Sequence, residues 1–146
     1  MKAQVTFCGG MRFVGQASSG HAVVMDTAAA NGGLDSAARP SEMLLIGLAG
    51  CTGMDVISIL RKKRQPVTGL EVIVHAEQAP DHPKLFTTMT VEYRVTGAGV
   101  DPEAVRRAIE LSESTYCSVG QTLRNPVSIT STFTVVEADK PNTASG

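Results

Sequence analysis

The apolar positions of this chain follow two different periods, and the first of them predicts strands. Three short runs rich in Val, Phe and Met cover residues 4–8, 11–16 and 21–26, and the turn signals "GG" and "SSG" separate them. Short apolar runs bounded by glycine and serine are typical of strands that are joined by tight turns. The beginning of the chain therefore predicts an antiparallel meander.

A long apolar segment follows, after a loop rich in small residues at positions 27–38. The stretch "RPSEMLLIGLAGCTGMDVISILRKKRQP", residues 39–66, is almost wholly apolar. It predicts one helix of about 24 residues, which is about 36 Å long, and its apolar residues occupy more than one face. A helix that is apolar all round must be buried on all sides.

The length of this helix favours a homodimer. One small sheet from a chain of 146 residues is not expected to cover the helix alone, so a second copy of the chain is the natural partner. Gly47, Gly50 and Gly53 remove side chains from part of the helix surface and permit close approach of another backbone. We expect the two long helices to pack together.

Beyond residue 66 the apolar period changes to two. In residues 70–77 apolar side chains such as Leu70 and Val72 occupy every second position, so they share one face of a strand. Residues 85–96 show the same alternation, and the turn "APDHPK" separates the two segments. This pattern predicts a hairpin of two half-buried strands.

The last third of the chain predicts two helices and a strand. "DPEAVRRAIELSEST" has Asp101 as helix N-cap and Pro102 at the first helical position. "YCSVGQTLR" predicts a second, short helix, and alternating apolar positions at residues 127–135 predict a final strand. The element order indicates an α+β fold with a largely antiparallel sheet. We expect one domain over residues 1–137 and a polar C-terminal tail at 138–146.

Composition narrows the function classes. The net charge is −1, so no global field favours nucleic acid or an anionic membrane as a partner. The first residues lack the layout of a signal peptide, and Asp55 and Ser58 interrupt the longest apolar segment. We therefore expect a soluble cytoplasmic protein.

The three cysteines are the candidate chemistry. Their number is odd, they form no CxxC pair and no His lies at ligand spacing, which suits neither a secreted disulfide framework nor a zinc site. The apolar pattern alone favours Cys51 as buried core, since free Cys packs as a small hydrophobe. Cys117 lies where one predicted helix stops and another begins, a position that stabilises a thiolate. We interpret Cys8 as structural.

Several of these motifs together resemble the OsmC/Ohr family of thiol-dependent hydroperoxide reductases. The resemblance lies in "RPSEMLLIGLAGCTGMDVISILRKKR", in "YCSVGQTL" with a cysteine 66 positions after Cys51, in "SSGH" and "MDT", and in "HPKLFTTMTVEYRVTG". It covers nearly the whole chain. It implies an OsmC-like fold in which antiparallel sheets wrap around long central helices in an intertwined homodimer, with active sites at the interface.

The resemblance also implies a reaction. Cys51 would attack an organic hydroperoxide and become a sulfenic acid, Cys117 would resolve it as a disulfide, and an external dithiol would restore both thiols. No metal or organic cofactor is required. The side chains of Met43, Leu44, Leu48 and Met54 would form an apolar substrate site.

The chain departs from the family pattern in the groups that activate the thiolate. The family has a Glu directly after the helix-starting Pro and an Arg from the N-terminal strands, whereas here Ser41 follows Pro40 and Glu42 comes next. Arg12 is our candidate for the activating Arg, and Arg39 is the alternative. Glu42 is our candidate for the carboxylate that would hold this Arg, in place of the family's Glu.

Asp55 lies one turn after Cys51 on the same helix face. A carboxylate among apolar residues needs a partner, so we expect a hydroxyl, an Arg or a backbone amide beside it. The alternative to an enzyme is a non-catalytic dimer of the same fold, which binds a small apolar or electrophilic ligand and uses its cysteines as redox sensors or as core residues.

Overall fold

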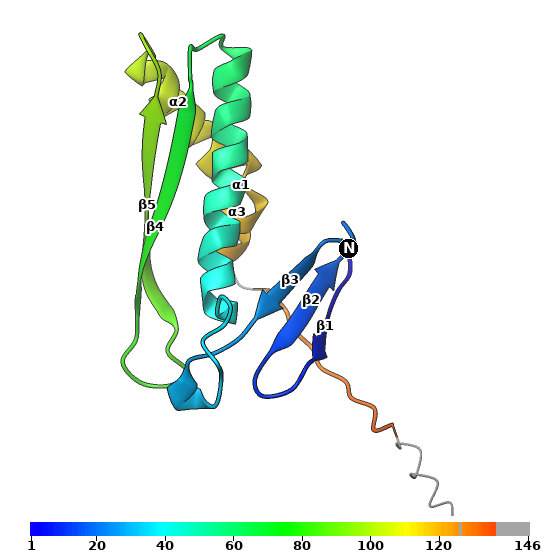
Figure 1. Ribbon diagram of the computed structural model, residues 1–146. Coiled ribbons are helices and arrows are strands. Elements are labelled where there is room, and N and C mark those ends of the chain that lie inside the picture. The colour runs from blue at the N-terminus through cyan, green and yellow to red at the C-terminus, as the bar shows by residue number, and fades with distance from the viewer. Residues whose placement is uncertain (126, 137–146) are drawn as a thin grey trace, which may run out of the picture.

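The N-terminal meander is confirmed. A computed structural model describes residues 1–125 and 127–136. In it, β1 (Ala3–Phe7), β2 (Phe13–Ala17) and β3 (Ala22–Met25) form a three-stranded antiparallel sheet in the order β1-β2-β3. The sheet lies beside the N-terminal end of the long helix (Figure 1).

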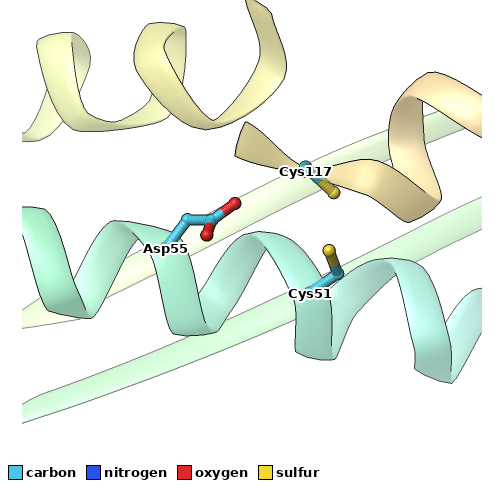
Figure 2. Close-up of side chains that lie close together, drawn as sticks. All are labelled: Cys51, Asp55 and Cys117. Atoms are coloured by element: carbon cyan, nitrogen blue, oxygen red, sulfur yellow. The ribbon is translucent and has the colours of Figure 1, made fainter. Parts of the chain in front are cut away.

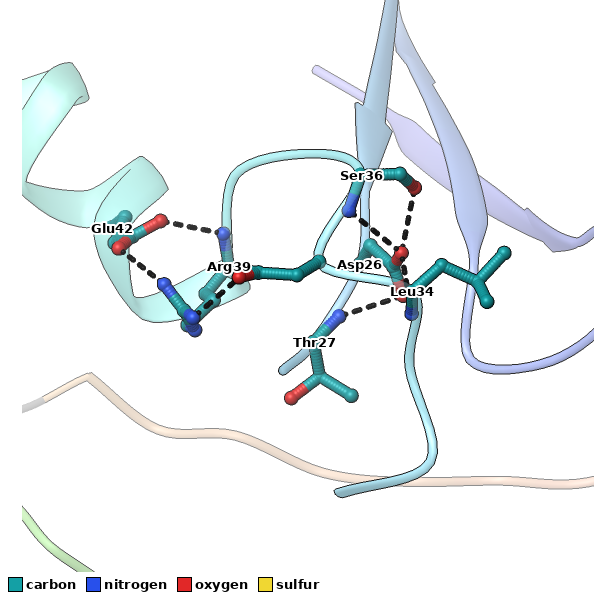
Figure 3. Close-up of polar contacts among 7 residues, drawn as sticks. Asp26, Thr27, Leu34, Ser36, Arg39 and Glu42 are labelled. Carbon is teal, nitrogen blue, oxygen red and sulfur yellow. Dashed lines mark hydrogen bonds and ion pairs between the residues drawn. The ribbon is translucent and has the colours of Figure 1, made fainter. Parts of the chain in front are cut away.

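The loop at residues 27–38 is held in place by one carboxylate. Asp26 is only 1% exposed, and its two oxygens accept hydrogen bonds from the amides of Thr27, Leu34 and Ser36 and from the Ser36 hydroxyl. The loop also contains one 3₁₀ turn, η1 (Ala29–Asn31). These donors outweigh burial and lower the pKa of Asp26 to about 2. A network of this kind fixes the chain immediately before the long helix (Figure 3).

The long helix α1 covers Pro40–Lys62, close to its predicted bounds. Arg39 is its N-cap residue, and Glu42 accepts the Arg39 amide as in a capping box. The residues on its buried side recur every four positions: Leu48, Thr52, Val56 and Leu60.

Much of the remaining surface of α1 is exposed to solvent in the single chain. Leu44, Ile46 and Met54 are 46%, 55% and 73% exposed. One chain therefore does not cover the helix, as its apolar pattern predicts. By length and composition alone α1 could span a membrane, a property that it shares with central helices of soluble folds.

The hairpin and the second helix enclose the core. Strands β4 (Gly69–Gln78) and β5 (Phe86–Thr96) form a separate two-stranded antiparallel sheet, which runs along α1 (Figure 1). Helix α2 (Pro102–Leu111) begins as predicted, with Asp101 accepting the Glu103 amide. The central cluster consists of Val56, Leu60, Ala104 and Ala108. The single, largely antiparallel sheet that the sequence predicts is thus two sheets, because no strand bridges the meander and the hairpin in the described chain.

Two short helical segments end the ordered elements. A π-helical turn, η2 (Ser112–Tyr116), continues directly from α2, and α3 (Ser118–Arg124) follows with Cys117 as its N-cap. The predicted junction at Cys117 is therefore present. π-Helical turns are rare and often lie at functional sites.

The predicted final strand is wrong for residues 127–135. These residues form no ladder, and Ile129 and Phe133 are 86% and 91% exposed. An alternating apolar pattern becomes a strand only beside a free sheet edge, and this segment leads away from the helices instead (Figure 1). The predicted tail at 138–146 lies outside the described residues.

Candidate active site

The fold brings the two predicted reactive cysteines together. Cys51 comes from the middle of α1 and Cys117 from the start of α3, and both are free thiols. Their Sγ atoms and a carboxylate oxygen of Asp55 all lie within 4.8 Å of one another. Figure 2 shows the two sulfurs pointing toward each other across the gap between the helices, with Asp55 beside them. Cys51 is half-buried, whereas Cys117 is only 2% exposed.

A chain of hydroxyl groups holds Asp55. The Ser112 hydroxyl donates to Asp55 Oδ2 at 2.9 Å. Ser112 Oγ lies 2.9 Å from Thr52 Oγ1, which lies 2.6 Å from the Tyr93 hydroxyl. The sequence predicts a hydroxyl, an Arg or a backbone amide beside Asp55, and the partner is a hydroxyl. The chain joins α1, β5 and the π-helical turn, and it includes the buried polar side chains of Thr52 and Ser112.

Cys117 receives a backbone donor but remains disfavoured as a thiolate. The Gly120 amide donates to Cys117 Sγ at 3.3 Å, as expected for the first residue before a helix. Burial nevertheless raises the pKa of the Cys117 thiol, and the neighbouring Cys51 thiol and the Asp55 charge raise it further. A Cβ at position 120 would lie 3.2 Å from the same sulfur, so glycine permits this close approach of the amide.

A pocket of about 370 Å³ lies beside Cys117, between α1, β5 and α3. Arg124 and Glu113 are the charged residues of its lining, and Cys51 does not contribute to it. The full lining is Leu48, Thr52, Phe86, Thr87, Thr88, Met89, Val91, Tyr93, Glu113, Cys117, Gly120, Leu123 and Arg124. The pocket therefore reaches the thiol pair from the Cys117 side.

The four predicted substrate-binding residues do not gather in one place in the single chain. Leu48 lines the pocket beside Cys117. Met54 lines a shallow groove on another face of α1, together with Gly50 and Gly53. Met43 is half-buried and Leu44 is exposed, and neither lines either hollow. Their role as a substrate site stays a prediction.

The predicted activating groups lie away from the thiols within one chain. Glu42 Oε1 accepts the Arg39 guanidinium at 3.0 Å, and Arg39 also pairs with Asp35 (Figure 3). The Arg39 amide and guanidinium lower the pKa of Glu42. Glu42 precedes Cys51 by nine positions, which is about 14 Å along a straight helix.

Arg12 lies in the exposed turn between β1 and β2. Within residues 1–125 and 127–136 it forms no hydrogen bond or ion pair with Cys51 or Cys117. The roles of Arg12 and Glu42 therefore remain predictions that the single chain does not complete.

Sequence reasoning missed the residues that support the thiol pair. Thr52, Ser112 and Tyr93 come from three elements, and nothing in their local patterns marks them. The available signal was Asp55 itself, since a carboxylate in an apolar helix requires donors and "SESTY" supplies hydroxyls where the following helix ends.

The sequence and the fold correspond to a known family. The sequence model described as "OsmC-like protein" matches residues 33–132. The chain belongs to the OsmC family, and its fold is an α+β fold of antiparallel sheets and helices.

Individual relatives agree with this assignment. Protein YhfA of Escherichia coli K12 is 41% identical over 138 residues, which cover 94% of this chain and all of that protein. The crystal structure of a hypothetical protein from Aquifex aeolicus is similar with a TM-score of 0.73 and 26% identity, over 84% of this chain and 86% of that one. An organic hydroperoxide resistance protein from Legionella pneumophila shares the fold, with a TM-score of 0.60, 14% identity and coverage of 84% and 88%.

Proposed function

We propose that the protein reduces organic hydroperoxides to alcohols with its own cysteines. The observation that carries this proposal is the position of Cys51 Sγ and Cys117 Sγ within 4.8 Å of each other, close enough for a disulfide to form with small side-chain movements. Some structural neighbours are named organic hydroperoxide resistance proteins, which agrees with this reaction.

The reaction follows from the different surroundings of the two thiols. Cys51 is the more exposed of the pair and is the attacking thiolate. It takes the terminal oxygen of ROOH, the O–O bond breaks, and the leaving alkoxide takes a proton and departs as ROH. Burial keeps Cys117 protonated until the sulfenic acid has formed. As Cys117 Sγ attacks the sulfenic sulfur, its proton passes to the leaving hydroxyl, so that the disulfide forms and water leaves. An external dithiol reduces the disulfide and becomes oxidised itself.

The active form in this proposal is a cytoplasmic homodimer. The apolar side chains that α1 leaves exposed in one chain are buried against the second copy. The partner also brings a cation to Cys51: Arg12, or else Arg39 held by Glu42, would stabilise the thiolate. Met43, Leu44, Leu48 and Met54 would then line an apolar site, which favours alkyl or lipid hydroperoxides over hydrogen peroxide.

A turnover assay tests this function. Purified protein is given cumene hydroperoxide or hydrogen peroxide, with dihydrolipoamide or glutathione as reductant. We expect turnover with the organic peroxide and the dithiol, and complete loss in Cys51→Ser. Cys117→Ser should retain one round of peroxide reduction but lose sustained turnover. Cys8→Ser is the matched control, because Cys8 is exposed and, among the described residues, its thiol donates only to the carbonyl of Thr6 in the adjacent strand. Equal rates for wild type and Cys51→Ser would refute the proposal.

A second candidate function is supported by the pocket beside Cys117. It is largely apolar and of a size suited to a small molecule. The protein would then bind a small apolar or electrophilic ligand without turnover, and the cysteines would act as sensors or core. Stoichiometric modification of Cys117 by an electrophile, with no peroxide consumption, would favour this function.

A further inference from the structure

The thiol pair and Asp55 form a set of metal-ligand atoms that the sequence spacing does not reveal. Two sulfurs and one carboxylate oxygen, from residues 51, 55 and 117, lie within 4.8 Å of one another. From this arrangement we propose that the reduced protein binds a thiophilic divalent cation of the zinc class between Cys51, Asp55 and Cys117. The sequence predicts no zinc site because its cysteines form no CxxC pair and no His lies at ligand spacing. Cys51 and Cys117 are 66 positions apart, and the packing of α3 on α1 brings them together.

The spacing of the three atoms suits such an ion. Zinc binds thiolate sulfur at about 2.3 Å and carboxylate oxygen at about 2.0–2.2 Å, so two sulfurs on one tetrahedral ion lie about 3.8 Å apart. The two sulfurs lie within 4.8 Å of each other, so they need to approach by no more than about 1 Å to reach this value. All three side chains already point into the same gap between the helices (Figure 2).

The ligand types select the class of ion. Two soft thiolates favour Zn²⁺ over Mg²⁺ or Ca²⁺, which prefer sites made only of oxygen. Two thiolates and a carboxylate carry three negative charges, which an ion of charge +2 largely offsets. The chain supplies three ligands and leaves the fourth position for water, as in zinc sites that remain reactive.

Hydrogen bonds from neighbouring groups already orient two of the three ligands. Ser112 Oγ donates to Asp55 Oδ2, and Thr52 lies in hydrogen-bond contact with Ser112. The other carboxylate oxygen of Asp55 accepts no hydrogen bond from residues 1–125 and 127–136. The Gly120 amide donates to Cys117 Sγ. Donors of this kind fix the geometry of ligands and stabilise a bound thiolate. Cys51 and Asp55 are only half-buried, so an ion can reach the site from the Cys51 side.

Binding would oppose the buried thiol's preference for its proton. Cys117 must lose its proton to bind, so each ion releases protons and affinity rises with pH. Metal binding and a Cys51–Cys117 disulfide also exclude each other, since both use the same sulfur electron pairs. When a hydroperoxide oxidises the loaded pair, two thiolates, ROOH and two protons give the disulfide, ROH, water and the free ion. This last consequence rests on the proposed function; the site itself does not.

Cobalt titration tests the site directly. Metal-free protein reduced with a phosphine is titrated with Co²⁺, and the thiolate-to-cobalt charge-transfer band is measured, followed by displacement with Zn²⁺. We expect a one-to-one band in the wild type. Cys51→Ser and Cys117→Ser should each weaken binding about 100-fold or more, and Asp55→Asn about tenfold. Cys8→Ser is the matched control and should leave the titration unchanged. Absence of the band in the wild type, or an equal band in Cys117→Ser, would overturn the proposal.

A second measurement needs no variant and so does not depend on the folding of one. Wild-type protein is alkylated with and without Zn²⁺, and each cysteine is followed by mass spectrometry. Zinc should protect Cys51 and Cys117 but leave Cys8 reactive; equal protection of all three, or of none, contradicts the site. Turnover without metal binding would refute this inference alone, whereas metal binding without turnover would refute the proposed peroxidase alone.

Discussion

Two carboxylates of this protein each accept a hydrogen bond from a serine hydroxyl, yet they have different surroundings. Asp26 is 1% exposed and accepts four hydrogen bonds, three from backbone amides and one from Ser36. Asp55 is half-buried, accepts one hydrogen bond from Ser112, and otherwise faces two thiols. Among the residues that the structure describes, four donors contact the carboxylate of Asp26 and one contacts that of Asp55, so Asp55 can accept further hydrogen bonds or bind an ion.

The difference separates a carboxylate that stabilises the fold from one that can take part in the chemistry of the site. Donors that surround a carboxylate stabilise its charge and fix the segments that carry the donors. A carboxylate with one donor and two titratable neighbours instead influences the protonation of those neighbours and can take an additional ligand. Mutations of the two residues should therefore affect different measurements.

The largest expected effect is on stability. Asp26→Asn replaces one acceptor oxygen by an NH₂ group that faces amide donors, and we expect the melting temperature to fall by on the order of 5 °C or more. Asp55→Asn should change it far less, since the Ser112 hydroxyl can still donate to the amide oxygen. Thermal unfolding at neutral pH compares the two variants. Equal losses would mean that Asp55 is also a structural anchor.

The next effect is on the pH dependence of folding. The pKa of Asp26 is about 2 in the folded protein, against an ordinary value of 3.8. As pH falls, the Asp26 carboxylate is therefore protonated in the unfolded chain at a higher pH than in the folded protein. Its stabilisation is complete above about pH 4 and is lost progressively as pH falls toward 2. Denaturant midpoints across this range should fall less steeply in Asp26→Asn than in the wild type. Asp81→Asn, at an exposed turn, should follow the wild-type curve.

A smaller effect concerns the reactivity of the thiols. Burial raises the pKa of Cys117, with further contributions from Cys51 and the charge of Asp55. We expect Cys117 in metal-free protein to react with iodoacetamide about tenfold more slowly than Cys8 near pH 8. Asp55→Asn removes one cause of the raised pKa and should move the pH profile of Cys117 to lower pH. A profile that does not move would show that Asp55 has no electrostatic effect on this thiol.

The smallest effect tests the end of the hydroxyl chain. Tyr93→Phe removes the hydroxyl that lies 2.6 Å from Thr52 Oγ1, and the free energy of unfolding should fall by about 1 kcal/mol. Tyr116→Phe is a matched control, because Tyr116 is 58% exposed, and should change it little. Urea unfolding measures both. A similar fall in the two variants would argue that the loss is not specific to the network.

The sequence predicts the elements of this fold better than it predicts their partners. The long helix and the hairpin follow from strong local periods, and α2 follows from Asp101 and Pro102. The predicted strand at residues 127–135 fails because strand formation also requires a free edge, which a local alternation cannot supply. The predicted single sheet is two sheets, because no strand of the described chain joins the meander to the hairpin, and local patterns do not show which strands pair.

The candidate site was predictable only in part. The approach of Cys117 to Cys51 follows from the family resemblance and not from spacing. The need of Asp55 for a donor follows from its apolar surroundings, but the choice of Ser112 depends on how the π-helical turn packs on α1. Asp26 gave no signal, since an Asp after a strand has the pattern of an ordinary turn residue.

The meeting of residues 51 and 117 also has a topological consequence. A bond between the two sulfurs would close a covalent ring that contains the hairpin and α2, while the N-terminal sheet would remain outside it. Closing a loop of this length lowers the conformational entropy of the unfolded chain, which raises the free energy of unfolding by about 4 kcal/mol. The oxidised protein would then unfold at a markedly higher temperature than the reduced one. The melting curve of a mixed sample would therefore show what fraction of the protein carries the Cys51–Cys117 disulfide.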